Sequence, residues 1–415
     1  MENSMTIPLL NNRRILLGVT GSIAAYKAAD LASKLTQAGM QVDVILSAAA
    51  RKFVTPLTFQ SVTGRKAFTE TDLWGEEAHV LHVGLVEGAG AFMIAPATAN
   101  TIAKLATGQA DSLLTLTALA ARCPLIVAPA MDVGMYEHVA TQANVKTLRE
   151  RGVFFAGPAE GRMASGLTGK GRMLEPPALI GALRQVLGQS GPLHGRKIVV
   201  TAGGTQEAVD PVRVLANRSS GKQGFALAQT AIDQGGSVVL IAGPTSLPAP
   251  FGARRIEVTT AAEMFAATLD SVEDADVLLM AAAVADFRPR ETAIEKIKRK
   301  KQIPEIPLER TEDVLAEVSK RRAKTGWPRV IVGFAAESQE MVENAQRKLE
   351  EKGLDLVVAN DITAADAGFA VDTNRVTLLD RTGDSETLPL MAKTAVAEEV
   401  LQRVVLLLDK SGDRS

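Results

Sequence analysis

Short apolar runs alternate with longer amphipathic stretches along most of the chain. In the first part, runs of strand length occur at 13–19, 42–47, 91–96 and 124–129. Residues 20–27 are predicted to turn into a helix that runs to about Ala38, where Gly39 ends it, and the alanine- and leucine-rich residues 99–121 predict a second helix. Strands that alternate with helices form parallel β-α-β units, so the pattern predicts a doubly wound α/β sheet. Ligands of such sheets bind beyond the carboxyl ends of the strands.

The alternation stops near residue 188 and then starts again. Residues 188–195 combine glycine, serine and proline in a pattern typical of a linker. Further strands are predicted at 197–202, 237–242, 277–283, 329–335, 355–359 and 375–380, with a closing helix at 389–408. We therefore expect two Rossmann-like, doubly wound domains, residues 1–188 and 189–415. No GxGxxG motif follows a predicted strand and no Walker P-loop occurs, so neither a dinucleotide site nor that type of ATPase is supported.

The composition agrees with a soluble protein of two domains. A chain of 415 residues is too long for one typical core, and its net charge of −1 favours neither nucleic acid nor a membrane surface as a partner. The single cysteine, Cys123, excludes an intramolecular disulfide and is expected in a core strand. The first residues lack a signal-peptide pattern and no apolar run has membrane-spanning length, so we expect a cytoplasmic protein.

The longest stretch of candidate chemistry follows the predicted strand 197–202. Two glycines, Gly203 and Gly204, let the backbone turn sharply, and the polar segment NRSSGK at 217–222 precedes a helical pattern that opens at 225–228. The unpaired N–H groups at a helix N-terminus bind anions, particularly after glycines and hydroxyl side chains. An ordinary strand–loop–helix connection is the simpler interpretation, but the length and polar content of this loop favour a binding site.

Other candidates follow the later strands of the second domain. Asp286 ends a small-residue stretch, where it can hold a magnesium ion or a hydroxyl group, or cap a turn; Phe334 lies in GFAAE at 333–337. Lys348 and Lys352 share one helix face, which is more often simply solvated. The basic run KIKRKK at 296–301 has no interleaved aromatic residues, so it favours a loop that closes on a polyphosphate over a nucleic-acid site, with a solvated loop as the alternative.

The first domain offers fewer ionisable candidates. His82 precedes the small-residue turn 95–100, and because a histidine titrates near neutral pH it suits general acid–base catalysis, although a lone histidine is more often structural. Asp132 follows Pro-Ala-Met at the end of the predicted strand 124–129. The glycine-rich residues 164–173, which include Ser165, have neither helix nor strand periodicity and predict a flexible flap, with a passive surface loop as the alternative.

At these motifs, from Arg13 to about Leu408, the chain resembles the bacterial bifunctional phosphopantothenoylcysteine decarboxylase/phosphopantothenate–cysteine ligase family. The first half is similar to flavin-dependent cysteine decarboxylases at TGSIAAYK (20–27), FVTPLTF (53–59), His82, APATAN (95–100) and PAM (129–131). The second half resembles the ligase at TAGGT (201–205), NRSSGK (217–222), AAAVAD (281–286), EKIK (295–298), GFAAE (333–337) and AND (359–361).

The resemblance implies two successive reactions on small molecules, with neither nucleic acid nor membrane as a partner. The ligase would activate 4'-phosphopantothenate with CTP and Mg²⁺, and cysteine would then displace CMP. Asn217 would hold the acyl intermediate, Lys296 would neutralise charge at the carboxylate and α-phosphate, and the nucleotide site would comprise Asp286, Lys296, Phe334, Lys348 and Lys352. The decarboxylase would use FMN, with His82 as acid or base. Its FMN site would comprise Gly21, Ser22, Ser47, Thr98 and Asn100.

Two positions depart from the family's pattern. Asp132 replaces an asparagine that helps to bind the substrate carboxylate, which an ionised aspartate repels. Ser165 replaces a flap cysteine that completes reduction of the enethiol intermediate, and a hydroxyl is far less acidic than a thiol and has no comparable redox chemistry. The two departures concern the second half of the decarboxylase reaction, whereas the ligase motifs are intact.

Two alternatives stay open beside the bifunctional enzyme. One is an active ligase with an FMN-binding domain of weak or incomplete decarboxylase activity. The other is a flavoprotein regulatory subunit, such as a phosphatase-inhibiting relative of the decarboxylases, which the intact ligase half disfavours. The resemblance also implies a homo-oligomer, with trimeric decarboxylase contacts around FMN and dimeric ligase contacts, which together allow a dodecamer.

Overall fold

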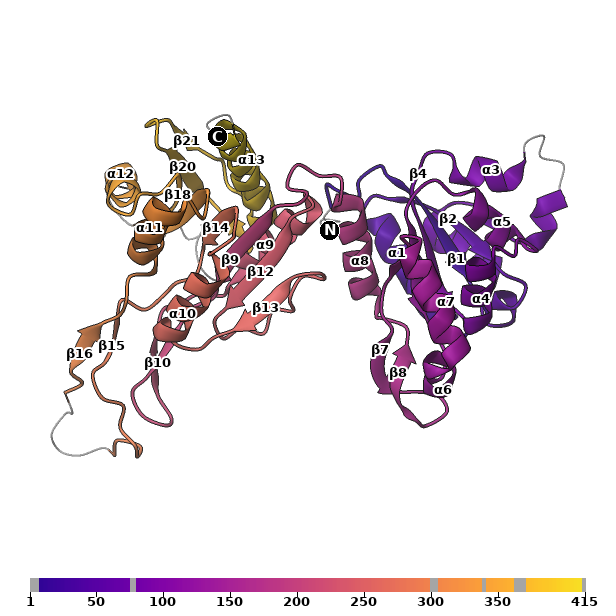
Figure 1. The fold of residues 1–415 in the computed structure, drawn as a ribbon, viewed down its shortest axis with the longest axis horizontal. Helices are drawn as coiled ribbons and strands as arrows, with labels where there is room; N and C mark the ends of the chain where they lie inside the picture. Colours follow the sequence, from indigo (N-terminus) through magenta and orange to yellow (C-terminus); the bar gives the residue numbers. More distant parts are fainter. Residues whose placement is uncertain (1–6, 75–79, 299–304, 338–340, 362–370, 413–415) are drawn as a thin grey trace. The chain divides into compact units, whose positions relative to one another are not determined.

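The computed structural model describes residues 7–74, 80–298, 305–337, 341–361 and 371–412, and it divides into two compact units (Figure 1). Unit 1 spans Met1–Gly188 and unit 2 spans Gln189–Ser415. Each unit is built around one sheet covered by helices. Within the described residues, no helix combines the length and apolarity that crossing a membrane requires.

Unit 1 has a six-stranded parallel sheet in the order β3-β2-β1-β4-β5-β6. Helices α1 and α8 pack together on one face, and a core cluster joins α4, α5 and α7 to the other. The elements are β1 Arg14–Val19, α1 Ala25–Gln37, β2 Gln41–Leu46, α2 Pro56–Thr63, β3 Ala67–Phe68, α3 Leu81–Val86, β4 Ala89–Ala97, α4 Ala99–Thr107, α5 Leu113–Ala120, β5 Leu125–Pro129, α6 Val133–Glu137, α7 Val139–Glu150, β6 Phe154–Phe155, β7 Ala159–Arg162, β8 Thr168–Arg172 and α8 Pro176–Gly188, with 3-10 helices η1 Ala50–Lys52 and η2 Glu70–Trp74.

Unit 2 repeats this strand order in an eight-stranded sheet, β13-β12-β9-β14-β17-β18-β20-β21, in which β20 and β21 are antiparallel. Two small hairpins, β10–β11 and β15–β16, extend from it (Figure 1). The elements are β9 Lys197–Ala202, β10 Gln206–Ala208, β11 Val214–Ala216, α9 Lys222–Asp233, β12 Ser237–Ala242, β13 Arg254–Glu257, α10 Ala261–Ser271, β14 Val277–Met280, β15 Phe287–Pro289, β16 Leu308–Arg310, α11 Val314–Thr325, β17 Val330–Glu337, α12 Met341–Glu351, β18 Leu356–Asp361, β19 Thr373–Asn374, β20 Val376–Asp380, β21 Ser385–Thr387, β22 Met391–Ala392 and α13 Lys393–Gly412.

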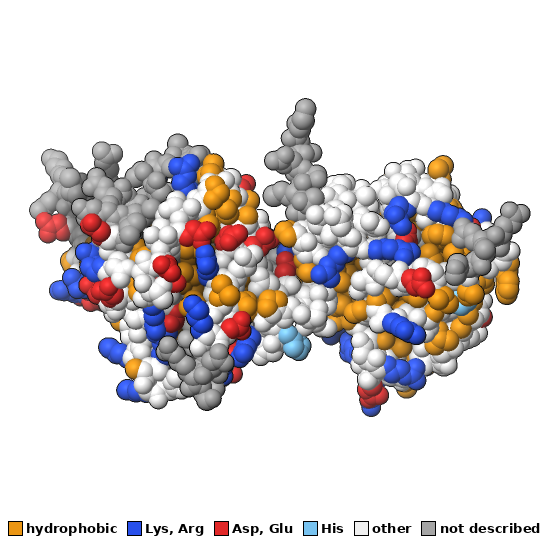
Figure 2. Space-filling model, turned by 90° about the horizontal axis from the view of Figure 1, so that it is seen from above, with side chains coloured by type: hydrophobic (Ala, Val, Ile, Leu, Met, Phe, Trp, Pro, Cys, Tyr) orange, Lys and Arg blue, Asp and Glu red, His pale blue; other side chains and the backbone are white. Residues whose placement is uncertain are grey.

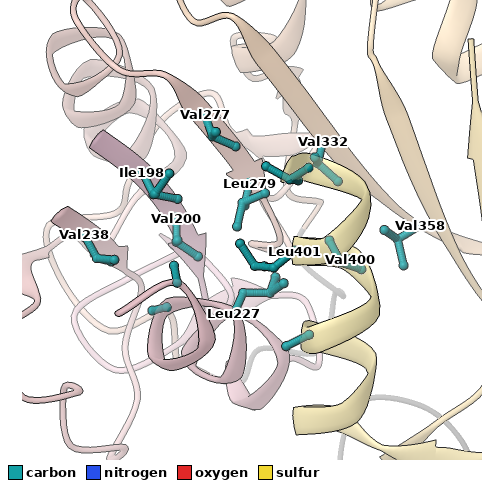
Figure 3. Close-up of a cluster of buried hydrophobic side chains, with 14 of the residues drawn as sticks. Ile198, Val200, Leu227, Val238, Val277, Leu279, Val332, Val358, Val400 and Leu401 are labelled. Carbon is teal, nitrogen blue, oxygen red and sulfur yellow. The ribbon is translucent and has the colours of Figure 1, made fainter. Parts of the chain in front are cut away.

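The continuous apolar runs of unit 2 reflect a sheet that is buried on both faces. Successive strand residues point to opposite faces, so Ile198 and Val200 of β9 pack against α9 and α13, where Leu227 and Leu401 meet them (Figure 3). Val199, between them, belongs to the cluster on the opposite face, beneath α10, α11 and α12. This arrangement explains why the strands show no alternation of polar and apolar residues.

The predicted doubly wound α/β fold is confirmed, with local corrections. The single helix expected over 99–121 is wrong, because Gly108 ends α4 in the left-handed conformation (φ +73°) and Ser112 starts α5 with a capping box. Cys123 lies in the loop before β5 rather than in a core strand, and burial raises the pKa of its thiol. The strand expected at 277–283 ends at Met280, because residues 281–283 leave the ladder and retain only a bridge from Gly204 to Ala283.

Candidate active sites

The first candidate site lies at the carboxyl ends of β1, β4 and β5. Here the strand order of unit 1 reverses, which is where doubly wound sheets bind ligands. A cavity of about 670 Å³ opens between the turn after β1, the turn after β5 and the β7–β8 hairpin. Among its lining residues are Gly21, Ser22, Lys27, Thr98, Met131, Asp132, Arg162, Ser165 and Arg172.

Three turns at this edge are tied together by contacts that only small residues allow. A Cβ on Gly21 would lie 2.5 Å from the Cβ of Ala49, so glycine is needed for the turn after β1 to pack against the turn after β2. The hydroxyl of Thr20 donates to the carbonyl of Pro96 (2.7 Å) and accepts from the N–H of Thr98 (3.2 Å). These bonds fix the backbone that faces the cavity.

The two residues that depart from the family pattern contact each other. Ser165 Oγ donates a hydrogen bond to Asp132 Oδ2 (2.5 Å), and the other carboxylate oxygen accepts from the N–H of Gly134 (3.1 Å) at the start of α6. Both oxygens of Asp132 are therefore engaged, one by the backbone and one by the β7–β8 hairpin. The two substitutions form one structural unit within the cavity wall.

The expected flexible flap at 164–173 is wrong in its secondary structure. Residues 168–172 form β8, which pairs antiparallel with β7, and Gly166 turns the tip with φ +88°. Glycines at alternate positions conceal the periodicity that would otherwise indicate strands. The hairpin is anchored at its base, where the N–H of Met131 donates to the carbonyl of Gly171 (3.0 Å).

Positive charge lies along one wall of the cavity, a feature that was not predicted from the sequence. Lys27 Nζ lies 2.6 Å from Glu175 Oε1, and Arg172 Nη2 lies 3.2 Å from the same oxygen, so one carboxylate pairs with two cations. Arg162 also lines this wall. Lys27 ends the TGSIAAYK motif and lies near the start of α1, a position that could have indicated its role. The wall suits an anionic group of a ligand.

Three residues predicted for this site do not line the cavity of the single chain. Ser47 follows β2, and Asn100 lies in the first turn of α4. Both are beside the turns that form the cavity, but neither is a lining residue. His82 lies half-buried on α3, and its Nδ1 is buried without a hydrogen-bond partner within the described part of the chain.

The second candidate site lies at the carboxyl ends of β14 and β17 in unit 2. A cavity of about 750 Å³ is lined by Asp286, Phe334, Lys348 and Lys352, four of the residues predicted for a nucleotide site. Lys348 Nζ donates to the carbonyl of Phe334 (2.6 Å), and Lys352 forms an ion pair with Asp313, which also lines the cavity. The helix face of the two lysines is thus turned toward a cavity rather than to open solvent.

Asp313 was not predicted, although it follows the strand β16 and begins α11. Its carboxylate accepts from the N–H of Ala316 (2.9 Å) and from Lys352. Burial opposes ionisation, but the hydrogen bonds from Lys352 and Ala316 hold the pKa of Asp313 below its usual value. Asp313 therefore orients the amino group of Lys352 at the cavity wall.

Asn217 lies where the β10–β11 hairpin leads toward α9. Its side-chain amide donates to the carbonyl of Val284 (3.0 Å), which connects it to the segment before Asp286. The predicted helix begins at Lys222, with Gly221 as its N-cap at φ +77°. A Cβ on Gly243, which follows β12, would lie 2.4 Å from the carbonyl oxygen of Gly204, so glycine is required for the turns after β9 and β12 to pack together.

Lys296 does not line the second cavity. It is exposed in a loop between β15 and β16, and its neighbour Ile297 is hydrogen-bonded to the β10–β11 hairpin. Residues 299–301 of the basic run lie outside the described residues, as do the side chains of Glu337 and Asp361 from two quoted motifs.

Comparison with known proteins places the whole chain in one family. Residues 7–188 match the family model "Flavoprotein", and residues 193–407 match "DNA/pantothenate metabolism flavoprotein C-terminal domain". The Coenzyme A biosynthesis bifunctional protein CoaBC of Bacillus subtilis is 43% identical over 410 residues, covering 98% of this chain and 100% of that protein. Its counterpart from Mycobacterium tuberculosis is 42% identical over 408 residues, covering 95% and 97%.

Solved structures are similar to each half. A crystal structure of the C-terminal domain of a CoaBC protein is 36% identical and covers 53% of this chain and 100% of that chain, with a TM-score of 0.45. The FMN-dependent cysteine decarboxylase SpaF is 33% identical and covers 42% and 99%, with a TM-score of 0.37. From the two family models and the full-length relatives, the chain belongs to the family of coenzyme A biosynthesis bifunctional proteins.

Proposed function

We propose that this chain converts 4'-phosphopantothenate to 4'-phosphopantetheine in two reactions, one in each unit. Unit 2 would ligate cysteine to the substrate with CTP and Mg²⁺, and unit 1 would decarboxylate the product with FMN. One observation supports this assignment above the others: each unit has a cavity at the carboxyl edge of its sheet, and each cavity is lined by residues predicted for the reaction of that unit. Both cavities have volumes typical of small-molecule sites.

In the ligase half, the second cavity would hold the nucleotide. Lys348 and Lys352 would supply positive charge for the triphosphate of CTP, and Phe334, whose carbonyl accepts from Lys348, would supply an aromatic ring beside them. Magnesium would arrive with the phosphates, its usual partners beside one or two carboxylates, for which Asp286 is the candidate. Fixed charges and hydrogen bonds of this kind accelerate acyl activation by orientation and electrostatic stabilisation.

Asn217 and Lys296 would act on the activated acyl group rather than on the base. Asn217 approaches the carbonyl of Val284 and so lies beside the stretch that leads to Asp286. Lys296 would bring a mobile positive charge from the neighbouring loop to the carboxylate and the α-phosphate. This division predicts that the two residues affect chemistry more than CTP binding.

In the decarboxylase half, the first cavity has the size and lining that a flavin needs. Gly21 provides close backbone approach, Ser22 and Thr98 provide hydroxyls, and Lys27 and Arg172 provide charge for an anionic group. FMN, when bound, would supply the oxidation of the cysteine thiol end that makes the carboxylate a leaving group. The chain would orient the substrate and exclude water through the β7–β8 hairpin.

Residues outside the single-chain cavity fit an oligomeric site. Unit 1 exposes large apolar side chains, among them Trp74 at 88% and Val139 at 76% exposure, and Figure 2 shows apolar side chains on its surface. Exposed apolar surface of this kind favours contact with another copy. We propose that a second copy completes the FMN site of a trimer, and that His82 contributes its acid–base group there. Dimeric contacts between ligase halves would then allow a dodecamer.

The contact between Asp132 and Ser165 supports one alternative for unit 1. Without a flap thiol, the final protonation and reduction of the enethiol would be slow, leaving a decarboxylase of incomplete activity beside an active ligase. The Asp132–Ser165 pair is the specific observation that favours this second candidate.

Assaying each half with its own substrate tests the proposal. Purified protein given 4'-phosphopantothenate, cysteine, CTP and Mg²⁺ should release CMP, and protein given 4'-phosphopantothenoylcysteine alone should release carbon dioxide. The protein should also be yellow, with one FMN per chain after denaturation. A colourless protein that cannot be reconstituted with FMN would contradict the assignment of unit 1, and ligation without CMP release would contradict that of unit 2.

A further inference from the structure

A buried carboxylate lies at the turn of the β10–β11 hairpin, away from the lining of both cavities. Asp210 is only 2% exposed. Its Oδ1 accepts from the N–H groups of Val212 and Arg213, each at 2.9 Å. Its Oδ2 accepts from Nε (2.9 Å) and Nη2 of Arg213 and from the N–H of Ile297 (3.1 Å). The Arg213 guanidinium holds the pKa of the Asp210 carboxyl well below its usual range.

The same ion pair holds the neighbouring loop from two sides. Asp210 accepts from the N–H of Ile297, and Arg213 Nη2 donates to the carbonyl of Ile297 (3.0 Å). Both polar groups of this one backbone residue are thus bound to the hairpin turn. Residues 292–298 contain neither helix nor strand, so tertiary contacts must set their conformation.

Two further bonds attach the loop to the hairpin upstream of Ile297. Thr292 Oγ1 donates to the carbonyl of Ala208 (3.1 Å), and the N–H of Ala293 donates to the carbonyl of Val209 (3.1 Å). The two hydrogen bonds at Ile297 thus fix the residue that directly follows Lys296.

We infer that Asp210, paired with Arg213, is a positioning residue for Lys296, and that the β10–β11 hairpin thereby aligns Lys296 with Asn217. The inference rests on the proposed ligase function. Asn217 follows β11 directly, so one short hairpin has Asp210 at its turn and Asn217 at its exit. A hairpin held by backbone pairs at Gln206–Ala216, Glu207–Leu215 and Ala208–Val214 transmits the position of one end to the other.

The charge of Asp210 is central to this role. A carboxylate can accept from the arginine fork and three N–H groups together, whereas an asparagine amide offers one oxygen and brings two donors of its own. In Asp210→Asn, the amide nitrogen would face the guanidinium and the N–H of Ile297. The hydrogen bonds that hold Ile297 should weaken, while the second cavity, formed by other elements, stays intact.

A double-mutant cycle separates positioning from mere stabilisation. The rate of pyrophosphate release is measured with CTP, Mg²⁺ and 4'-phosphopantothenate in the absence of cysteine, together with the Kd for CTP. We expect Asp210→Asn to slow release about 10²-fold, the size of effect that a misplacement of about 1 Å produces. The Kd for CTP should change less than about threefold. In the Lys296→Ala background, Asp210→Asn should cause no further loss, because its effect passes through Lys296.

Asp276→Asn is the matched control. Asp276 is also buried, accepts from Arg196 Nη1 (2.9 Å) and from the N–H of Lys197 (2.9 Å), and lies at the opposite end of β9 from the predicted site. It should lower the thermal unfolding temperature while leaving the release rate within about threefold. If Asp210→Asn does not fold, Arg213→Lys replaces it, since the Arg213 side chain is 49% exposed; it should slow release about tenfold.

The outcomes distinguish this inference from the proposed function. If the wild-type protein releases pyrophosphate and both Asp210→Asn and Arg213→Lys release it at the same rate, the positioning role of Asp210 is overturned while the proposed ligase function stands. An additional loss in the double variant equal to the loss in Asp210→Asn would show a role independent of Lys296 and would also overturn it. If the wild-type protein releases no pyrophosphate, the ligase function itself fails and the inference falls with it.

Discussion

Gly171 gives the sharpest structural test of the first cavity. It lies buried in β8, where its carbonyl accepts from the N–H of Met131 at the base of the hairpin. A Cβ built on Gly171 would lie 2.3 Å from the carbonyl oxygen of Met131 and 2.8 Å from Met163 Cε. The methionine methyl group can move away, but the Met131 oxygen belongs to the backbone after β5. Gly171→Ala should therefore push the hairpin outward by about 1 Å.

The magnitude follows from that overlap. Inserting a methyl group into a packed site costs about 1–3 kcal/mol. Because Ser165 and Arg172 line the cavity from the same hairpin, the displacement should be felt by the ligand. If the whole cost falls on the liganded state, FMN binding weakens about 5- to 150-fold. The effect should leave the ligase half untouched.

Fluorescence titration of flavin-free protein with FMN measures the Kd directly. Gly134→Ala is the control, since its Cβ would meet nothing closer than Asp132 Oδ1 at 3.7 Å, and alanine favours the helix α6. Gly134→Ala should keep the wild-type Kd within about twofold, the ordinary error of a tolerated surface change. If Gly171→Ala binds FMN as tightly as Gly134→Ala does, the β7–β8 hairpin does not shape the flavin site and this reasoning is wrong.

Four further predictions concern the two sites. Lys296→Ala should lower CMP formation to a small residual rate with unchanged FMN content, which product analysis and flavin absorbance check together; loss of FMN or wild-type ligation would show a wrong assignment. Asn217→Ala should retain CTP binding while turnover falls about 10²–10³-fold, the usual effect of removing one stabilising donor; weakened CTP affinity with intact chemistry would make Asn217 a nucleotide ligand instead. Ser165→Cys should raise the yield of 4'-phosphopantetheine and suppress a leaked product lighter by two hydrogens, observed by mass spectrometry; clean wild-type conversion that Ser165→Cys leaves unchanged would refute the need for a thiol. Because the pKa of Asp210 is depressed in the folded protein, its stabilising contribution is complete above the ordinary aspartate pKa of about 4 and falls progressively as pH drops toward the lower folded pKa. Asp210→Asn should therefore show a smaller drop in thermal unfolding temperature than the wild-type protein between about pH 5 and pH 3, where this loss begins; an equal drop in both proteins would contradict this.

The strands were predictable because burial on both faces leaves a continuous apolar run. The run at 197–202 matches β9, and 237–242 matches β12. The break between α4 and α5 also has sequence signals, Gly108 followed by Ser112, but a composition rich in helix formers concealed them. The β7–β8 hairpin could not be predicted, since its glycines remove the side chains whose alternation marks a strand.

The sites were predictable as far as strand ends determine them. Phe334 lies in the second half of β17 and Asp286 follows the neighbouring parallel strand β14, so both lie at one edge of the sheet. The face of α12 that Lys348 and Lys352 occupy depends on how the helix packs, which spacing alone does not give. The contact between Asp132 and Ser165 joins residues 33 positions apart through a hairpin that was not predicted. Lys296 and His82 do not line either cavity, so the ends of the strands do not determine where they act.

We propose above that one chain performs both reactions in sequence. The most direct measurement gives the purified protein 4'-phosphopantothenate, CTP, Mg²⁺ and cysteine labelled in its carboxyl group, and follows CMP, labelled carbon dioxide and the mass of the product. We predict CMP and labelled carbon dioxide in equal amounts, with 4'-phosphopantetheine as the main product beside the leaked species that is lighter by two hydrogens. CMP release with the label retained in 4'-phosphopantothenoylcysteine would contradict the decarboxylase assignment, and the absence of both CMP and labelled carbon dioxide would contradict the ligase and decarboxylase assignments together.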